Sequence, residues 1–273
     1  MDYFEDTSKY IYHYTSTETL VKYILPQKQL LFSSINISND PEENKYHLLK
    51  AIDDDGKLEE NIGKNIDYSL KLSKEIIKNV KTICFSQDGN VPLIVDMCLG
   101  KGYKKPRMWA QYANNSTGVC LAFNKENIIE NFNNQYENIQ HFSGNVSYGN
   151  QLTYEYNHPY AETMLSSELQ TKTIEEIASL KINEYFELYY FSKHIDWQTE
   201  NEFRLVIKPQ NTGTSQNYLF IDGALEKIIL GNNFDEAIIP SVKILSSNFE
   251  HKPQIIPLVY NGNNYTLDEP IEY

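Results

Sequence analysis

Residues 196–207 read DWQTENEFRLVI, which places two glutamates one position apart at the start of an apolar, strand-like run. Side chains alternate between the two faces of a β-strand, so this pattern predicts that Glu200, Glu202 and Arg204 share one face. The alternation assigns three apolar side chains to the opposite, core-forming face: Phe203, Leu205 and Ile207. The polar face has two interpretations, a solvated surface or a pair of catalytic carboxylates. Charged surface runs are common, so the pattern alone favours the solvated face.

The rest of the chain mixes strand and helix patterns without repeats, a linker or a low-complexity tract. Apolar runs of strand length occur at 11–15, 30–32, 81–87, 117–124, 139–148, 202–208, 218–222, 227–230, 241–246 and 254–260. Helical patterns occur at 17–26, 40–52, 66–79, 107–113 and about 160–192. Strands that do not alternate regularly with helices indicate an α+β fold. We therefore predict one α+β domain over residues 1–273, with a helical insertion at about 160–192.

The charge balance disfavours a protein whose main role is to grip DNA or RNA. The chain carries 37 acidic and 24 basic side chains, for a formal net charge of −13. Such a surface repels polyanions on average. The one basic run, KGYKKPR at 101–107, is interpreted as a solvated loop.

The remaining composition indicates a globular protein without a metal site. The three cysteines, Cys84, Cys98 and Cys120, lie in apolar contexts and are interpreted as small buried side chains. The 21 tyrosines and 12 phenylalanines suit partly wet clefts and interfaces. The sequence lacks a recognisable signal peptide and any apolar run of the ~20 residues that a membrane span needs. We therefore expect a cytoplasmic protein with no membrane partner.

Several other residues are candidates for binding a ligand. His13 and Thr15 share a face of the predicted strand at 11–15, and together they could orient a ribose or an amide; a structural histidine is the alternative. Trp109 and Tyr112 lie three positions apart on a short helix, so they either pack in the core or stack on a flat ring. Arg107 precedes them and could meet a phosphate.

Several mechanisms lack their usual motifs. The sequence contains no Gly-rich phosphate loop, no GxSxG serine motif, and no HExxH or CxxC. A helix N-terminus explains the acidic cluster Asp40, Glu42 and Glu43 without a cation. No metal ligands are predicted.

The motifs together resemble the bacterial family of unknown function DUF2971. The resemblance rests on YHYTS at 12–16, NDPEE at 39–43, ICFS at 83–86, MWAQYANNSTGVCLAF at 108–123 and WQTENEFRLV at 197–206. Their order and spacing extend over most of the chain. The family name implies no activity.

A weaker resemblance links the N-terminal histidine strand and the late EFxLV strand to the NAD-dependent ADP-ribosyltransferases, in particular toxins that modify DNA. It implies that His13 helps to hold NAD and that Glu202 is catalytic, with Glu200 positioning the acceptor. Tyr14, Trp109 or Tyr112 would stack on nicotinamide, and Arg107 or Arg204 would meet phosphate. It also implies a mostly antiparallel sheet split around a cleft, with the helices of 17–79 packed on it.

Three functional hypotheses follow. The first is an NAD-consuming ADP-ribosyltransferase or NAD glycohydrolase, acting as a toxin or anti-phage effector on an unknown protein or nucleic-acid acceptor, with a possible cognate inhibitor. NAD would then be a substrate. The second is a non-catalytic module that binds a partner protein through a tyrosine-rich surface. The third is a nuclease or other hydrolase that uses Glu200 and Glu202 around a divalent metal.

Overall fold

The computed structural model describes residues 9–37, 50–53, 55–57, 62–89, 100–149, 163–209, 216–262 and 264–273. Within them, the central element is a nine-stranded sheet in the order β15-β14-β13-β6-β1-β5-β11-β7, with β3 also paired to β5. Its strands are β1 (Tyr10–Thr15), β3 (Ser33–Ser34), β5 (Lys81–Gln87), β6 (Val119–Asn124), β7 (Gln140–Asn145), β11 (Glu202–Lys208), β13 (Leu225–Leu230), β14 (Gln254–Tyr260) and β15 (Tyr265–Leu267). Only β13 and β14 pair in parallel, so the sheet is mostly antiparallel and the α+β prediction is confirmed.

Three smaller strand pairs flank this sheet. They are parallel β8 (Ser147–Gly149) with β10 (Ser192–His194), antiparallel β2 (Gln29–Leu31) with β12 (Tyr218–Phe220), and parallel β4 (Lys50–Ile52) with β9 (Thr163–Leu165). Strand β10 directly precedes the last helical turn before β11, so the β8–β10 pair lies close to the DWQTENEFRLVI stretch.

Helices cover both faces of the sheet and extend beyond one end. The α-helices are α1 (Thr17–Thr19), α2 (Leu25–Gln27), α3 (Ile62–Ile77), α4 (Pro106–Gln111), α5 (Lys125–Gln135), α7 (Ser166–Thr171), α8 (Ile174–Tyr190) and α9 (Ile239–Ser246). A π-helical turn, η1 (Leu20–Ile24), joins α1 to α2, and 3-10 turns are η2 (Ile35–Ile37), η3 (Gly102–Lys104), η4 (Ile195–Glu200) and η5 (Glu236–Ile238). Of the helices in these described ranges, none combines the length and apolarity required to cross a membrane.

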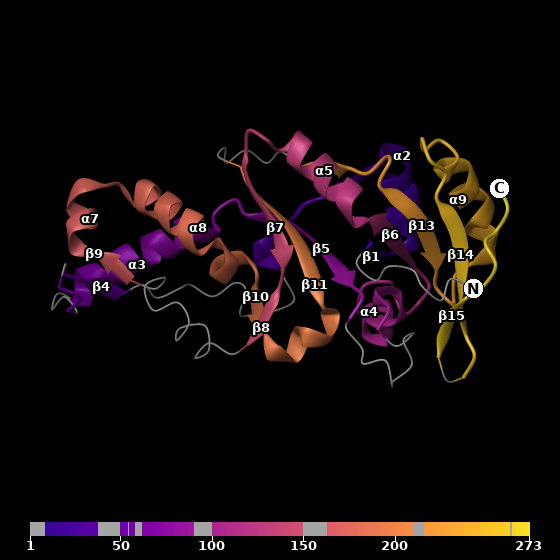
Figure 1. Ribbon diagram of the computed structural model, residues 1–273, viewed down its shortest axis with the longest axis horizontal. Coiled ribbons are helices and arrows are strands. Elements are labelled where there is room, and N and C mark those ends of the chain that lie inside the picture. Colours follow the sequence, from indigo (N-terminus) through magenta and orange to yellow (C-terminus); the bar gives the residue numbers. More distant parts are fainter. Residues whose placement is uncertain are drawn as a thin grey trace.

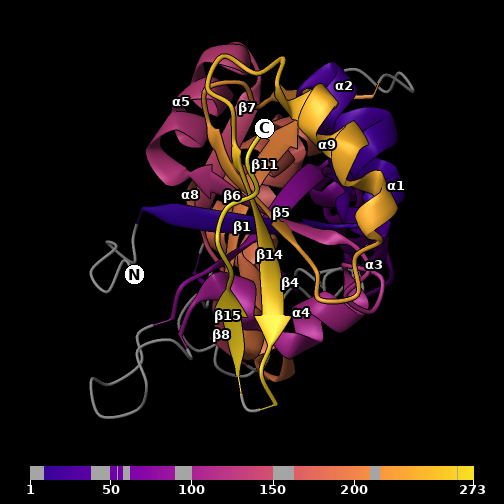
Figure 2. The same cartoon turned by 90° about the vertical axis from the view of Figure 1, so that its right-hand side faces the viewer.

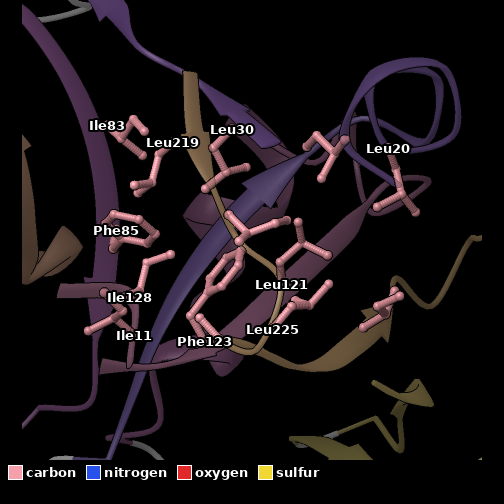
Figure 3. Close-up of a cluster of buried hydrophobic side chains, with 14 of the residues drawn as sticks. Ile11, Leu20, Leu30, Ile83, Phe85, Leu121, Phe123, Ile128, Leu219 and Leu225 are labelled. Atoms are coloured by element: carbon pink, nitrogen blue, oxygen red, sulfur yellow. The ribbon is translucent and has the colours of Figure 1, made fainter. Parts of the chain in front are cut away.

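The main hydrophobic core lies on the sheet face that η1, α2, α5 and α9 cover. Ile11 of β1, Phe85 of β5 and Leu121 of β6 are fully buried there, and Figure 3 shows them with their neighbours. Phe203, Leu205 and Ile207 belong to this core, which confirms the predicted apolar face of β11. Figure 2 shows α2 and α9 together on one side of the molecule.

The opposite face of the sheet packs on α4. Tyr12 and Tyr14 of β1 are buried there with Trp109, whose ring meets Tyr14 edge-on at 5.1 Å between centroids. Trp109 is therefore a core residue, as the simpler of its two interpretations predicted. Burial of these tyrosines also places part of the large tyrosine content inside the protein.

The predicted helical insertion forms an arm with its own core. In Figure 1, α3, α7 and α8 extend away from the sheet at one end of the molecule, with β4 and β9 among them. Leu72 and Ile76 of α3 pack there against Ile177 and Ile182 of α8. The expected packing of the 17–79 helices on the sheet is therefore correct for the first helical segment, whereas α3 packs on the insertion.

Two secondary-structure predictions are wrong. Residues 241–246 form part of helix α9, because Pro240 occupies its first turn and a short apolar run fits either element. Residues 50–52 form strand β4 and do not end a helix. The remainder of that predicted helix, including Asp40, Glu42 and Glu43, lies outside the described residues.

The loop between α4 and β6 has an unusual backbone. Asn114, Asn115 and Ser116 have φ values of 47°, 54° and 65°, so three successive non-glycine residues adopt the left-handed conformation. The backbone of Gly231 packs tightly against this loop, and its N–H donates to the Gly118 carbonyl at 3.0 Å. A Cβ at Gly231 would overlap the Ser116 carbonyl, so this contact requires glycine.

We predict that Gly231→Ala lowers the free energy of unfolding by at least about 2 kcal/mol, because the loop and strand β13 must separate to admit a methyl group. Urea unfolding at neutral pH measures the change. The matched control is Gly144→Ala, whose added Cβ would meet the Phe191 ring at an ordinary 3.5 Å. Equal losses in the two variants would contradict the steric explanation.

Candidate functional site

The main sheet opens along one edge of β5. The register joins β1 to β5 at Ile11 and Tyr12, and joins β3 to β5 at Ser33 and Ser34. Strand β11 occupies one edge of β5, so β1 and β3 share the opposite edge. Between the two pairings, the Nδ1 atom of His13 lies 3.0 Å from the carbonyl oxygen of Cys84. A side chain thus spans the gap where the two strands separate.

A cavity of about 250 Å³ lies at this opening. Its lining comes from β1, β2, β3, η2, β5, α4 and the residue after it, β10, η4 and β11: Tyr12, His13, Tyr14, Leu31, Ser33, Ser34, Ile35, Thr82, Ile83, Cys84, Phe85, Met108, Tyr112, Lys193, Glu200, Glu202 and Arg204. His13 and Tyr14 point to opposite faces of β1, and both reach the cavity because the sheet separates here.

Six of the nine predicted site residues line this cavity: His13, Tyr14, Tyr112, Glu200, Glu202 and Arg204. The other three are outside its lining. Thr15 is buried at the end of β1. The Trp109 indole donates to the Tyr103 carbonyl at 2.7 Å inside the core. Arg107 stacks on Trp197 at 4.4 Å and borders a larger adjoining groove of about 1150 Å³.

The carboxylates of the opening stretch are buried in a network of opposite charges. Glu200 and Glu202 are each 4% exposed and Arg204 is 2% exposed, so the solvated-face interpretation is wrong. Arg204 Nε donates to Glu202 Oε1 at 2.6 Å, and an Arg204 Nη atom donates to Oε2 at 3.0 Å. Lys193 Nζ donates to Glu200 Oε2 at 2.8 Å and to Glu202 Oε2 at 3.2 Å. Two carboxylates and two cations therefore balance their charges inside the protein.

Glu200 reaches this network from a different element than predicted. It ends the 3-10 turn η4, and Asn201 then adopts a left-handed φ of 44° before β11 begins at Glu202. Simple strand alternation from Glu200 is therefore wrong, although the turn returns its side chain to the same cavity. Ser86 Oγ and Lys105 Nζ each donate to the Glu200 carbonyl at 2.7 Å, and the Tyr112 hydroxyl donates to Oε1 at 3.1 Å.

The surroundings of Glu202 keep its carboxylate ionised. Burial by itself raises the pKa of Glu202, but the charge of Arg204, its hydrogen bond and the charge of Lys193 outweigh burial and hold the pKa at about 2. A buried Glu202 therefore carries its negative charge throughout the physiological range. Burial raises the pKa of Tyr148, whose hydroxyl accepts the Glu202 backbone N–H at 2.8 Å.

His13 is uncharged, in contrast to Glu202. Burial lowers the pKa of His13 below the usual 6.5, so its ring is neutral at pH 7. The Cys84 carbonyl can only accept a hydrogen bond, so Nδ1 carries the proton. Nε2 is then the hydrogen-bond acceptor of the ring. A neutral acceptor and the ionised carboxylate of Glu202 thus line one cavity.

Two polar residues of this site, Lys193 and Tyr148, were not predicted, and the predicted burial of Cys84 is wrong. Lys193 follows the long helix α8 directly, and Tyr148 pairs with it on the neighbouring strand. Neither residue stands in a recognisable motif. Cys84 is an exposed residue of the cavity wall, in contrast to the prediction of burial, because the sheet opens beside it. Cys120 is buried as predicted, and Cys98 lies outside the described residues.

The basic run at 101–107 is also more ordered than predicted. Lys104 is buried in the 3-10 turn η3, and Lys101 pairs with the buried Asp88 carboxylate at 3.0 Å. These residues form part of the support for α4 and do not form a solvated loop. Among the residues that the structure describes, no cluster of three or more His, Cys, Asp and Glu is arranged to hold a metal ion.

We predict that the depressed pKa of Glu202 makes stability depend on pH in the acidic range. A carboxyl with a pKa of about 2 in the folded state and 4.5 unfolded stabilises the fold above pH 4.5, and this contribution is lost as the pH falls towards 2. The free energy of unfolding should decrease by about 3 kcal/mol between about pH 6 and pH 2 because of this group.

Urea unfolding at several pH values measures the effect as a difference between variants. Glu202→Gln should have a shallower pH dependence than the parent, whereas Glu236→Gln, at an exposed position on η5, should retain the parental curve. A Glu202→Gln curve parallel to the parental one would contradict the assignment.

Comparison with known proteins gives a family match over part of the chain and no activity. A family model described as "Protein of unknown function (DUF2971)" matches residues 108–205. These residues include most of α4, all of β6 and the carboxylate stretch up to Leu205, while His13 and β5 lie outside the match. No curated protein and no solved structure matches the chain. Over residues 108–205, this match supports the resemblance to DUF2971 that the motifs predicted, while the motifs before residue 108 lie outside it.

Proposed function

We propose that this protein cleaves the nicotinamide–ribose bond of NAD, as an ADP-ribosyltransferase or an NAD glycohydrolase. The single observation that carries the proposal is that His13 and Glu202, 189 positions apart in sequence, line one cavity where the sheet opens. The cavity combines an ionised carboxylate, a neutral hydrogen-bond acceptor and tyrosine side chains. A ring-bearing ligand with hydroxyl groups and a developing positive charge suits this combination.

The size of the cavity favours one end of a dinucleotide. Its volume of about 250 Å³ is slightly below the ~300–1,000 Å³ of typical small-molecule sites. In the proposal, nicotinamide and its ribose enter the cavity, and the remainder of NAD extends outside. The Nε2 atom of His13 accepts a hydrogen bond from a ribose hydroxyl, and the side chains of Tyr14 and Tyr112 line the space for the nicotinamide ring.

The chemistry proposed for Glu202 is electrostatic. When the C–N glycosidic bond breaks, nicotinamide leaves as a neutral molecule with the bonding electron pair, and positive charge develops on the ribose. A fixed carboxylate stabilises that charge more in the transition state than in the ground state. Water that adds to C1′ and loses a proton gives ADP-ribose, whereas an acceptor nucleophile gives an ADP-ribosylated product. Glu200 is placed beside Glu202 to orient either nucleophile.

The arrangement supports this proposal better than the two alternatives. A divalent metal would need carboxylate oxygens that Lys193 and Arg204 already contact, so a metal-dependent nuclease would require these ion pairs to open. A tyrosine-rich surface that binds a partner protein is less well supported, because several tyrosines are buried, including Tyr10, Tyr12 and Tyr14. An acceptor of protein or nucleic acid, a cognate inhibitor and a role as toxin or anti-phage effector remain part of the proposal.

We predict that the purified protein releases nicotinamide from NAD and that Glu202→Gln lowers kcat at least about 100-fold, the scale expected for loss of a preorganised electrostatic group. Chromatography of nicotinamide over time, with and without cell extract as a source of acceptor, provides the measurement. The variant must retain a cooperative unfolding transition, because Arg204 then lacks its charged partner. Glu236→Gln, at an exposed position on η5, is the control. Intact NAD in both assays of the parental protein would refute the proposal.

We predict that His13→Ala lowers kcat/KM for NAD about 10-fold, because one net hydrogen bond to the ligand is lost. His251→Ala removes an exposed histidine outside this cavity and should keep the parental value. Steady-state kinetics at pH 7.5 compares the two variants. Equal kinetics for His13→Ala and the parent would exclude a binding role for this ring.

A further inference from the structure

The β8–β10 strand pair lies outside the main sheet, yet it holds both carboxylates of the site. Lys193 is 6% exposed and its ammonium group contacts Glu200 and Glu202 together. The same ammonium lies 4.9 Å from the centre of the Trp197 ring, which covers it from another side. An ammonium in this place is therefore desolvated and fixed by several contacts.

Lys193 and Arg204 contact the two carboxylates in different ways. Arg204 forms a two-point contact with Glu202, and its remaining Nη atom donates to the Tyr190 carbonyl at 2.9 Å. Lys193 bridges the two glutamates, and Glu200 receives its ionic contact from this bridge. Replacement of Lys193 by a neutral side chain would leave one guanidinium in contact with the two buried carboxyl groups. Lys105, whose ammonium donates to the Glu200 carbonyl at 2.7 Å, and the Tyr112 hydroxyl at Glu200 Oε1 would be the other groups beside them. One of the two acids would then take up a proton at a higher pH.

The same strand pair also fixes the backbone of Glu202. Lys193 lies opposite Tyr148 in the β8–β10 register, and the Tyr148 hydroxyl accepts the Glu202 N–H at 2.8 Å. The N–H of Val146, directly before β8, donates to the Glu202 carbonyl at 2.9 Å. The backbone and the side chain of Glu202 are thus both held from this one strand pair.

We propose that the β8–β10 pair is a positioning device in which Lys193 sets the spacing of Glu200 and Glu202 and keeps a positive charge beside both carboxyl groups, while Tyr148 fixes the backbone of Glu202. The catalytic consequence rests on the function proposed above: Glu202 is held in place to stabilise the ribose cation, and Glu200 is held beside it to accept a proton or a hydrogen bond from the nucleophile. Lys193 and Tyr148 act through the two carboxylates and are positioning residues.

The test is the pH dependence of Lys193→Met, because a residue with a merely structural role would change stability without moving a carboxyl titration. The acid limb of kcat for NAD cleavage should move upward by about one pH unit or more. Lys193→Arg restores a positive charge and should return the limb towards the parental position. Lys28→Met, which removes a cation paired with Asp222 outside the cavity, is the matched control and should leave the acid limb in place.

A second readout is independent of NAD. In protein labelled with ¹³C at the glutamate carboxyl carbons, Lys193→Met should show one carboxyl whose titration midpoint lies about one unit or more above its parental value. A folded Lys193→Met protein with parental titrations would overturn the inference. If the parental protein leaves NAD intact while the carboxyl midpoint moves as expected, the proposed function fails and the positioning role stands.

Tyr148→Phe tests the second part of the device. It removes the hydroxyl that accepts the Glu202 N–H, so kcat should fall about 10-fold with a smaller change in KM, since the carboxylate loses its alignment for the transition state. Tyr136→Phe, whose hydroxyl donates to the Tyr218 carbonyl at 2.8 Å, is the matched control and should retain parental kcat. A loss shared equally by both variants would assign Tyr148 to general stability only.

Discussion

The buried pairing of Glu200 and Glu202 with Lys193 and Arg204 is the constraint on which the site depends. Burying one unpaired charge costs several kcal/mol, so each of these side chains can be buried only if the others arrive with it. They come from η4, β10 and β11, and the pairing therefore joins these elements in one geometry. The low pKa of Glu202 follows from the same contacts, so its ionisation is a property of the assembled fold.

The second determinant of the site is the incomplete pairing along β5. A strand edge that β1 and β3 share at its two ends leaves a central gap, and His13 places a ring nitrogen on the Cys84 carbonyl within that gap. The Cys84 carbonyl is thereby hydrogen-bonded to a side chain in place of a ladder partner. The cavity exists because a side chain replaces a strand at this point.

The helical arm is coupled to the site through its last residues. Helix α8 ends at Tyr190, whose carbonyl accepts from Arg204 and whose hydroxyl donates to the Ile76 carbonyl of α3 at 2.7 Å. The chain then continues into β10 and places Lys193 at the carboxylates. The core of the insertion therefore anchors β10, the strand that carries Lys193 into the charge network.

Local patterns in the sequence predict the strands with clear alternation, the apolar face of β11, the burial of Trp109, the α+β class and the family match over residues 108–205. These features depend on local periodicity or on motif spacing, which neighbouring residues fix. The elements that cover the polar face of β11 are known only from the tertiary structure, because local periodicity does not specify contacts with distant residues. The bond from His13 to Cys84 spans 71 positions, and Lys193 approaches Glu202 from a separate strand pair. Alternation can assign Glu202 to a face, whereas only the folded chain brings the cations that let that face be buried.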